Sequence, residues 1–99
     1  MCAASIADPP TGTFLATVPS NTTVLQGSIM SFNCSTNANP PAHVYHFYLN
    51  QAPIGNSSTG VFSDTVEEDG VYTCVPINTV PGTGDNDTVS VTTVGELQM

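Results

Sequence analysis

The chain contains no lysine and no arginine, and its eight carboxylates give 99 residues a formal net charge of −8. Nucleic acid and anionic membrane surfaces are therefore disfavoured as partners, because binding to phosphate depends on cationic side chains. A basic protein or a polysaccharide remains compatible with this charge. No apolar run approaches the roughly 20 residues that cross a bilayer, so we expect no direct membrane insertion by this chain.

The chain also lacks a helical pattern, since apolar residues never recur at spacings of three and four over a long window. Eight prolines and eight glycines interrupt the sequence. Short runs of alternating apolar residues predict strands instead. The expected strands span residues 13–19, 22–26, 27–34, 44–49, 60–66, 71–77 and 88–94. We therefore predict an all-β domain.

Alternation within these strands predicts which side chains share a face. Phe14, Ala16 and Val18 share one face of the first strand. The strand at 60–66 would carry Asp64 toward the core beside its apolar residues, and burying a charge is costly. We therefore expect a bulge or a shifted register there. The residues predicted to face the core elsewhere are Met30, Phe32, Cys34, Tyr45, Phe47 and Leu49.

Residues 67–74 carry the most specific pattern in the chain, Glu-Glu-Asp-Gly-Val-Tyr-Thr-Cys. This run resembles the acidic-x-Gly-x-Tyr-x-Cys signature of immunoglobulin domains, and the resemblance covers roughly residues 11–97. It implies a two-sheet β-sandwich with Greek-key connections and an inter-sheet disulfide between Cys34 and Cys74. It also implies a tyrosine corner at Tyr72, whose hydroxyl should find a backbone partner.

The sequence has no tryptophan, although immunoglobulin domains usually carry one that packs against the disulfide. The resemblance places Phe47 at this position as a smaller ring. Only seventeen residues separate Asn50 from Glu68, too few for the strands of a variable domain. We therefore expect the intermediate or constant-2 type found in cell-adhesion and recognition receptors.

Residues 1–10 stand outside the domain pattern, and we expect the domain to span 11–97, since about 100 residues make one such sandwich. The first ten residues contain a third cysteine, Cys2, among small residues like those at the end of a secretory signal. We expect an N-terminal extension, or a remnant of a signal or of expression. An odd cysteine in a secreted chain also suggests intermolecular pairing or a free thiol.

The implied disulfide closes forty residues and should stabilise the fold by about 4 kcal/mol in the chain-entropy model. It needs an oxidising compartment, so we expect an extracellular location, at the cell surface or secreted. Two reduced cysteines in a cytosolic domain are the alternative.

Four Asn-x-Ser/Thr sequons offer sites for N-linked glycans, and none has proline at the middle position. Asn56 and Asn86 are expected in turns, where glycans are readily accommodated. Asn21 precedes an expected edge strand, and Asn33 points outward from its strand beside the disulfide cysteine. We expect two or three of these sites to be used.

Catalytic chemistry has little support, and we expect neither an enzyme nor a bound metal or cofactor. His43 and His46 lie three apart on a strand, which sets them on opposite faces and disfavours a shared metal. Asp85 and Asp87 flank Asn86, but a calcium cage needs about 6–8 oxygen ligands. We predict a solvated acidic loop at this position.

The resemblance implies protein binding, an argument from fold alone. We expect an extracellular domain of an adhesion or recognition receptor that binds another protein, a second copy included, through a sheet face or end loops. A spacer in a multi-domain ectodomain and a small secreted immune or defence ligand are alternatives. The expected face lies on the sheet that contains strands 44–49, 71–77 and 88–94. Its candidate contact residues are His43, His46, Tyr48, Thr83 and Asp85.

Overall fold

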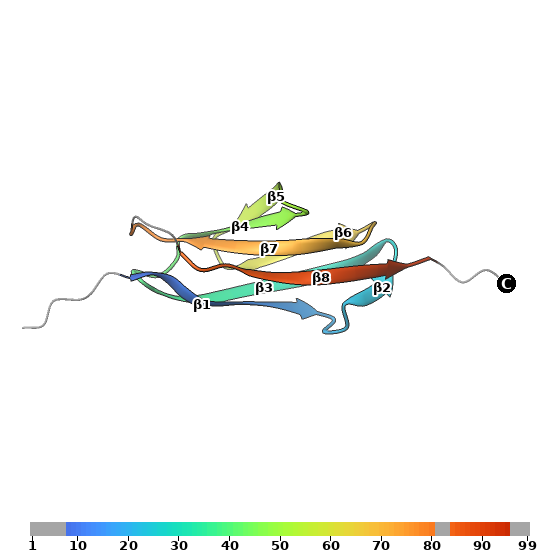
Figure 1. Cartoon of the computed structure of the whole chain (residues 1–99), viewed down its shortest axis with the longest axis horizontal. Helices are drawn as coiled ribbons and strands as arrows, with labels where there is room; N and C mark the ends of the chain where they lie inside the picture. Colours follow the sequence, from blue (N-terminus) through green and yellow to red (C-terminus); the bar gives the residue numbers. More distant parts are fainter. Residues whose placement is uncertain (1–7, 81–83, 96–99) are drawn as a thin grey trace, which may run out of the picture.

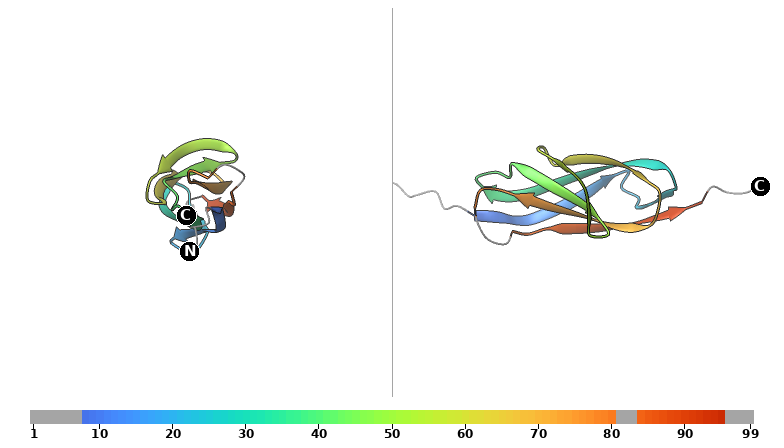
Figure 2. Two further views of the ribbon diagram at one scale, coloured as in Figure 1. Left: turned by 90° about the vertical axis from the view of Figure 1, so that its left-hand side faces the viewer. Right: turned by 90° about the horizontal axis from the view of Figure 1, so that it is seen from above.

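The computed structural model describes residues 8–80 and 84–95, and its regular elements are all strands. A three-stranded sheet has the order β1-β3-β6, and a five-stranded sheet has the order β2-β8-β7-β4-β5. The sheets form an elongated sandwich (Figure 1), whose strands curve around a common interior when viewed from the end (Figure 2). The predicted all-β sandwich is confirmed. The strands are β1 (Asp8–Val18), β2 (Thr23–Leu25), β3 (Ser28–Asn39), β4 (Val44–Leu49), β5 (Ala52–Ser57), β6 (Val61–Val66), β7 (Gly70–Ile77) and β8 (Asp87–Val94).

Among the described strands, five of the six neighbouring pairs are antiparallel. The sixth pair, β2 with β8, is parallel. The segment between Asn50 and Glu68 contains β5 and β6, with no third strand between them in this described part of the chain. Each predicted strand is present, and β5 is an addition that the sequence pattern did not indicate.

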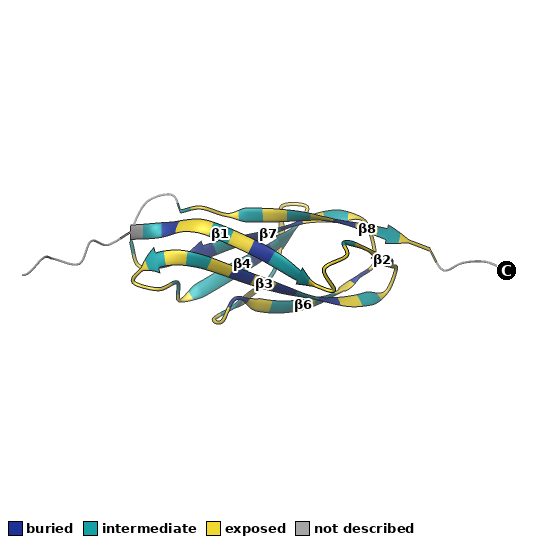
Figure 3. Ribbon diagram, turned by 90° about the horizontal axis from the view of Figure 1, so that it is seen from below, coloured by how far each residue is buried: buried dark blue, intermediate teal, exposed yellow. Residues whose placement is uncertain are grey.

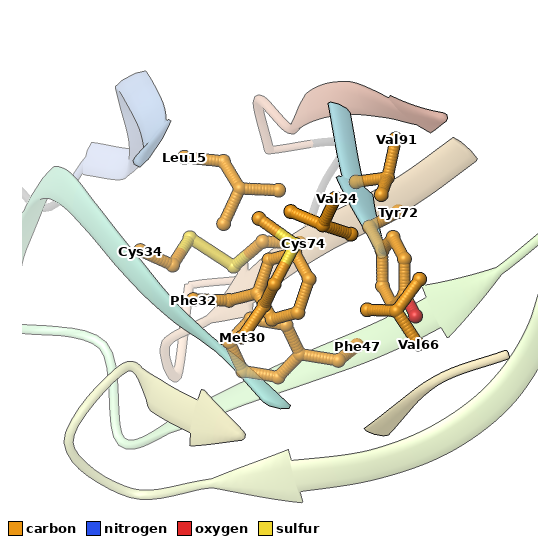
Figure 4. Close-up of a cluster of buried hydrophobic side chains, with 10 residues drawn as sticks. All are labelled: Leu15, Val24, Met30, Phe32, Cys34, Phe47, Val66, Tyr72, Cys74 and Val91. Carbon is orange, nitrogen blue, oxygen red and sulfur yellow. A yellow bond between two sulfur atoms is a disulfide. The ribbon is translucent and has the colours of Figure 1, made fainter. Parts of the chain in front are cut away.

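The core lies between the two sheets and is centred on a disulfide (Figure 4). The bond joins Cys34 on β3 to Cys74 on β7, one strand from each sheet, as the resemblance implied. Phe47 is fully buried and lies opposite Cys74 in the β4–β7 register. The buried residues of the core are Leu15, Val24, Met30, Phe32, Cys34, Phe47, Val66, Tyr72, Cys74 and Val91.

The first strand presents its expected apolar face to solvent. Phe14 and Val18 are 61% and 65% exposed, whereas Leu15 is 5% exposed and enters the core. The reason lies in the register, because Leu15 pairs with Cys34, whose side chain faces inward. Alternation then turns the neighbours of Leu15 outward.

The expectation of a bulge around Asp64 was wrong. β6 pairs with β3 in continuous register from Val61 to Val66, and Asp64 does point toward the interior. Its carboxylate accepts a hydrogen bond of 2.7 Å from the Tyr72 hydroxyl. The expected backbone partner of Tyr72 is thus replaced by a side chain, and the inward carboxylate gains a donor that removes the reason for a bulge.

The turn between β5 and β6 depends on a buried glycine. Gly60 has a φ of 90°, and a Cβ at this position would overlap the carbonyl oxygen of Cys34. The Gly60 carbonyl also accepts a 2.8 Å hydrogen bond from the Cys34 amide. Only glycine combines this backbone conformation with so close an approach.

Candidate functional site

The outer surface of the five-stranded sheet, here called the β4–β7–β8 face, is built by strand alternation. Phe47 and Cys74 point into the core, so their neighbours on β4 and β7 point to solvent. Register places Tyr48, Thr73 and Thr88 in one row across three strands. The residues that define the face are His46, Tyr48, Val71, Thr73, Val75, Thr88 and Ser90.

A hollow of about 390 Å³ opens at one side of this face. Its floor and walls come from two strands, β7 and β8, and from the turn between β4 and β5. The lining combines amide, hydroxyl and aliphatic groups. The lining residues are Asn50, Gln51, Val71, Thr73 and Thr88.

The turn that walls the hollow is fixed to β7. Asn50 and Gln51 have φ values of 52° and 71°, which is typical of a two-residue type I′ hairpin. The Asn50 amide donates to the Val71 carbonyl, and the Asn50 Oδ1 accepts from the Val71 amide, both at 2.9 Å. Gly70 allows this approach, because a Cβ there would lie 2.6 Å from the Leu49 Cδ1.

The β4–β7–β8 face carries no carboxylate, although the chain has eight. Four carboxylates elsewhere in the described residues, those of Asp64, Asp69, Asp85 and Asp87, accept hydrogen bonds from neutral donors. Asp69, for example, accepts bonds of 2.6 Å and 2.7 Å at its Oδ1 from the backbone amide and the hydroxyl of Thr93. These two bonds lower the pKa of Asp69 below its usual value, because they favour the charged form.

Two further carboxylates attach β1 to the start of β8. The Thr13 amide donates to Asp85 Oδ2 at 3.2 Å, and the Leu15 amide donates to Asp87 Oδ2 at 2.8 Å. The Asp85 amide in turn donates to the Pro10 carbonyl at 2.8 Å. β1 pairs with β3 alone, so these side chains take the place of a strand partner on its other edge. Asp85 is exposed in the loop before β8, as predicted, whereas Asp87 is half-buried and begins β8, so the predicted solvated loop is wrong at Asp87.

A comparison with protein families finds that the immunoglobulin domain model matches residues 13–93. The chain belongs to the immunoglobulin domain family. The match begins within β1 and ends within β8, so it covers both sheets and both disulfide cysteines. No curated protein matches the chain.

The predicted contact residues of this immunoglobulin domain divide into three groups. His46 and Tyr48 lie on the β4–β7–β8 face and are half-buried, and His43 lies exposed just before β4. Asp85 faces β1, away from this group, because its carboxylate is bound to Thr13. Thr83 lies outside the described residues.

Sequence reasoning missed the residues of the hollow. Val71 and Thr73 are outward positions of β7. The family signature concerns the inward residues of this strand, Tyr72 and Cys74, and carries no information about the outward ones. Asn50 offered a usable signal, because asparagine tolerates positive φ and follows a strand here.

The four sequon asparagines are all exposed in the immunoglobulin domain. Asn33 points outward from β3, as expected. Asn56 lies within the edge strand β5 instead of a turn, and Asn86 lies just before β8. Asn21 Oδ1 accepts a 3.0 Å bond from the Thr23 amide, which shapes the entry to β2.

Residues 8–80 and 84–95 contain no group of three His, Cys, Asp or Glu side chains arranged to hold a metal ion. The same ranges contain no helix with the length and apolarity required to span a membrane.

Proposed function

We propose that this immunoglobulin domain is an extracellular recognition module that binds another protein through the β4–β7–β8 face. The observation that carries the proposal is the hollow at one side of this face, on a surface whose residues include no carboxylate in a strongly acidic chain. A partner that docks there desolvates hydroxyl, aromatic and aliphatic groups and no carboxylate, which lowers the cost of binding. Interface centres in general are depleted in charge and enriched in tyrosine.

Tyr48 and the hollow supply complementary features for such a partner. Tyr48 lies in the same row as Thr73 and Thr88, which line the hollow. Its ring can pack against the partner while its hydroxyl bonds at the rim, and the hollow can receive a side chain from the partner. The face contains hydrogen-bonding groups for specificity and apolar area for affinity, and binding requires no chemical step.

The proposed location is supported by the covalent chemistry of the chain. The Cys34–Cys74 disulfide persists in oxidising compartments such as the cell exterior. Exposure of the four sequon asparagines is compatible with N-linked glycans, which are added in the secretory pathway.

A matched pair of threonine substitutions tests which face binds. Thr88→Glu adds a carboxylate to the β4–β7–β8 face, and Thr65→Glu adds one to an exposed position of β6 in the other sheet. A tagged, oxidised domain is screened against purified extracellular proteins, and each interaction found is measured for both variants. We expect Thr88→Glu to abolish binding and Thr65→Glu to leave it intact.

Tyr48→Ala tests the proposed anchor separately. A central aromatic residue typically contributes 2 kcal/mol or more, so binding should weaken about 30-fold. Binding that is lost with Thr65→Glu and kept with Thr88→Glu and Tyr48→Ala would assign recognition to the opposite sheet and contradict the proposal.

A spacer in a series of domains is the second candidate, and one observation favours it. β1 begins at one end of the sandwich and β8 finishes at the opposite end (Figure 1). This arrangement suits a module that extends a chain of domains. A spacer predicts that neither Thr88→Glu nor Thr65→Glu changes the binding of a longer protein that contains the domain.

A further inference from the structure

The outer surface of the three-stranded sheet, here called the β1–β3–β6 face, exposes several large apolar side chains. Of the eight large hydrophobic side chains exposed among the described residues, four lie on this face. Along β3 and β6, more exposed residues alternate with more buried ones (Figure 3). Large apolar side chains gathered on one exposed face mark a surface that another group can cover. The four residues are Phe14, Val18, Ile29 and Val61, with exposures between 51% and 70%.

The sequon residue Asn33 lies in the middle of this face. In the register of the central strand β3, Asn33 is opposite Ala16 on β1 and Val61 on β6. Phe14 and Val18 are its diagonal neighbours on β1, because they lie two residues on either side of Ala16. Diagonal neighbours are about 7–8 Å apart, within reach of a long side chain or of a group attached to one.

We propose that Asn33 carries an N-linked glycan whose first sugars cover the β1–β3–β6 face. A pyranose ring has apolar C–H surfaces that pack on aromatic and aliphatic side chains, while its hydroxyls remain in water. The Ser31 and Ser63 hydroxyls, which lie 3.2 Å apart on the same face, offer hydrogen bonds to sugar hydroxyls. No charged side chain lies on the face as described, so the sugars displace no ionic hydration.

The attachment uses the ordinary chemistry of the secretory pathway. The Asn33 side-chain nitrogen attacks C1 of a lipid-pyrophosphate-linked oligosaccharide. An N–C bond forms, the C1–O bond to the pyrophosphate breaks, and the lipid pyrophosphate leaves as the amide nitrogen loses one proton. The following residue, Cys34, faces the core, so its disulfide and the glycan occupy opposite sides of β3.

Occupancy is tested on the full chain secreted from eukaryotic cells. Glycosidase release in heavy-oxygen water converts each modified asparagine to a mass-labelled aspartate, which peptide mapping then locates. We expect label at Asn33 in the folded, disulfide-bonded protein. An unmodified Asn33 in that material would overturn the proposal.

Coverage of the face is tested by removing the sequon in two ways. Asn33→Gln and Ser35→Ala both abolish the sequon, Ser35→Thr preserves it, and Asn56→Gln removes a sequon from β5 in the other sheet. Each protein is assayed for binding of a dye that fluoresces on apolar surfaces and for solution mass by sedimentation. We expect Asn33→Gln and Ser35→Ala to gain dye binding and to self-associate, while the other two behave as the wild type.

Two measurements keep the test independent of variant folding. Adding Phe14→Ser to Asn33→Gln should reverse the gain in dye binding and self-association, because Phe14 is the largest exposed apolar group beside Asn33. Endoglycosidase trimming of the folded wild-type protein to one sugar per site should give dye binding between that of the untrimmed protein and that of Asn33→Gln. Glycan-free variants that stay monomeric and bind no dye would show that the sugars do not cover this face, and dimers in fully glycosylated protein would assign the face to a second copy instead.

Discussion

The Tyr72 hydroxyl donates a 2.7 Å hydrogen bond to the Asp64 carboxylate, and this pair connects β7 in one sheet to β6 in the other. In a chain without lysine or arginine, a phenol serves as the donor to an inward carboxylate. Burial raises the pKa of Tyr72 strongly, and the bond to Asp64 and its negative charge raise the pKa further. Tyr72 therefore stays protonated and remains a donor over the pH range of most proteins.

Tyr72→Phe should destabilise the domain by about 1.5–3 kcal/mol, the usual contribution of a hydrogen bond to a charged group. The loss arises because the inward carboxylate of Asp64 loses its hydrogen-bond donor. In urea denaturation the double variant Tyr72→Phe with Asp64→Val should lose less than the sum of the single variants, since both polar partners are gone. Strictly additive free energies would show that the two groups are not coupled.

Asp69→Asn should reduce the loss of stability in acid. The folded-state pKa of Asp69 is lowered by the Thr93 bonds, so its contribution is present above the unfolded value of about 3.9. The contribution is lost as pH falls through the lower folded value. The test follows thermal unfolding from pH 6 to pH 2, with Glu67→Gln as a control that leaves the Thr93 bonds in place. Identical acid profiles for wild type and Asp69→Asn would contradict the assignment.

Asp87→Ala should loosen β1 at Leu15, because the Leu15 amide loses its acceptor. The expected cost in unfolding free energy is about 1–3 kcal/mol, as for a buried donor left without a partner. Hydrogen exchange should show faster exchange at Leu15. Asp85→Ala is the comparison, since its bond to Thr13 is longer and exposed and should affect stability less. Equal losses of unfolding free energy for the two variants would contradict the expectation that the less exposed bond, from Leu15 to Asp87, contributes more to stability.

Two glycines with nearly the same φ separate backbone strain from steric overlap. Gly27 and Gly60 have φ values of 89° and 90°, but a Cβ at Gly27 would meet no atom within 4 Å. Gly27→Ala should therefore cost only the strain of the backbone, about 1–3 kcal/mol. Gly60→Ala should cost more, because it also pushes against the Cys34 carbonyl. Comparable unfolding free energies for the two variants would refute this difference.

The sequence predicted the strands whose apolar alternation is regular and buried. The range 44–49 matches β4, and the predicted strand at 88–94 differs from β8 by one residue. β5 was missed because Ala52–Ser57 contains proline, glycine and asparagine, which are poor strand formers. β5 forms because its backbone pairs with β4 at the edge of the sheet. This pairing does not require alternating apolar residues, so the sequence pattern does not indicate it.

The roles of the carboxylates could not be predicted, since each depends on contacts between distant segments. Asp85 and Asp87 bind amides 72 positions earlier in the chain, and no periodicity records such a pairing. Likewise, the outward face of β1 was fixed by its register with β3. The disulfide could be predicted because the family signature is defined by residue types and their spacing alone.

The attachment of β1 to β8 has a mechanical consequence. β1 and the segment 85–87 are parallel where they are attached, since Thr13 binds Asp85 and Leu15 binds Asp87. β2 also pairs with β8 in parallel. Because β1 starts at one end of the sandwich and β8 finishes at the other, tension between the ends slides the two strands past each other (Figure 1). The aspartate bonds and the β2–β8 ladder then bear the load together along the strands, so the domain resists stretching as one unit.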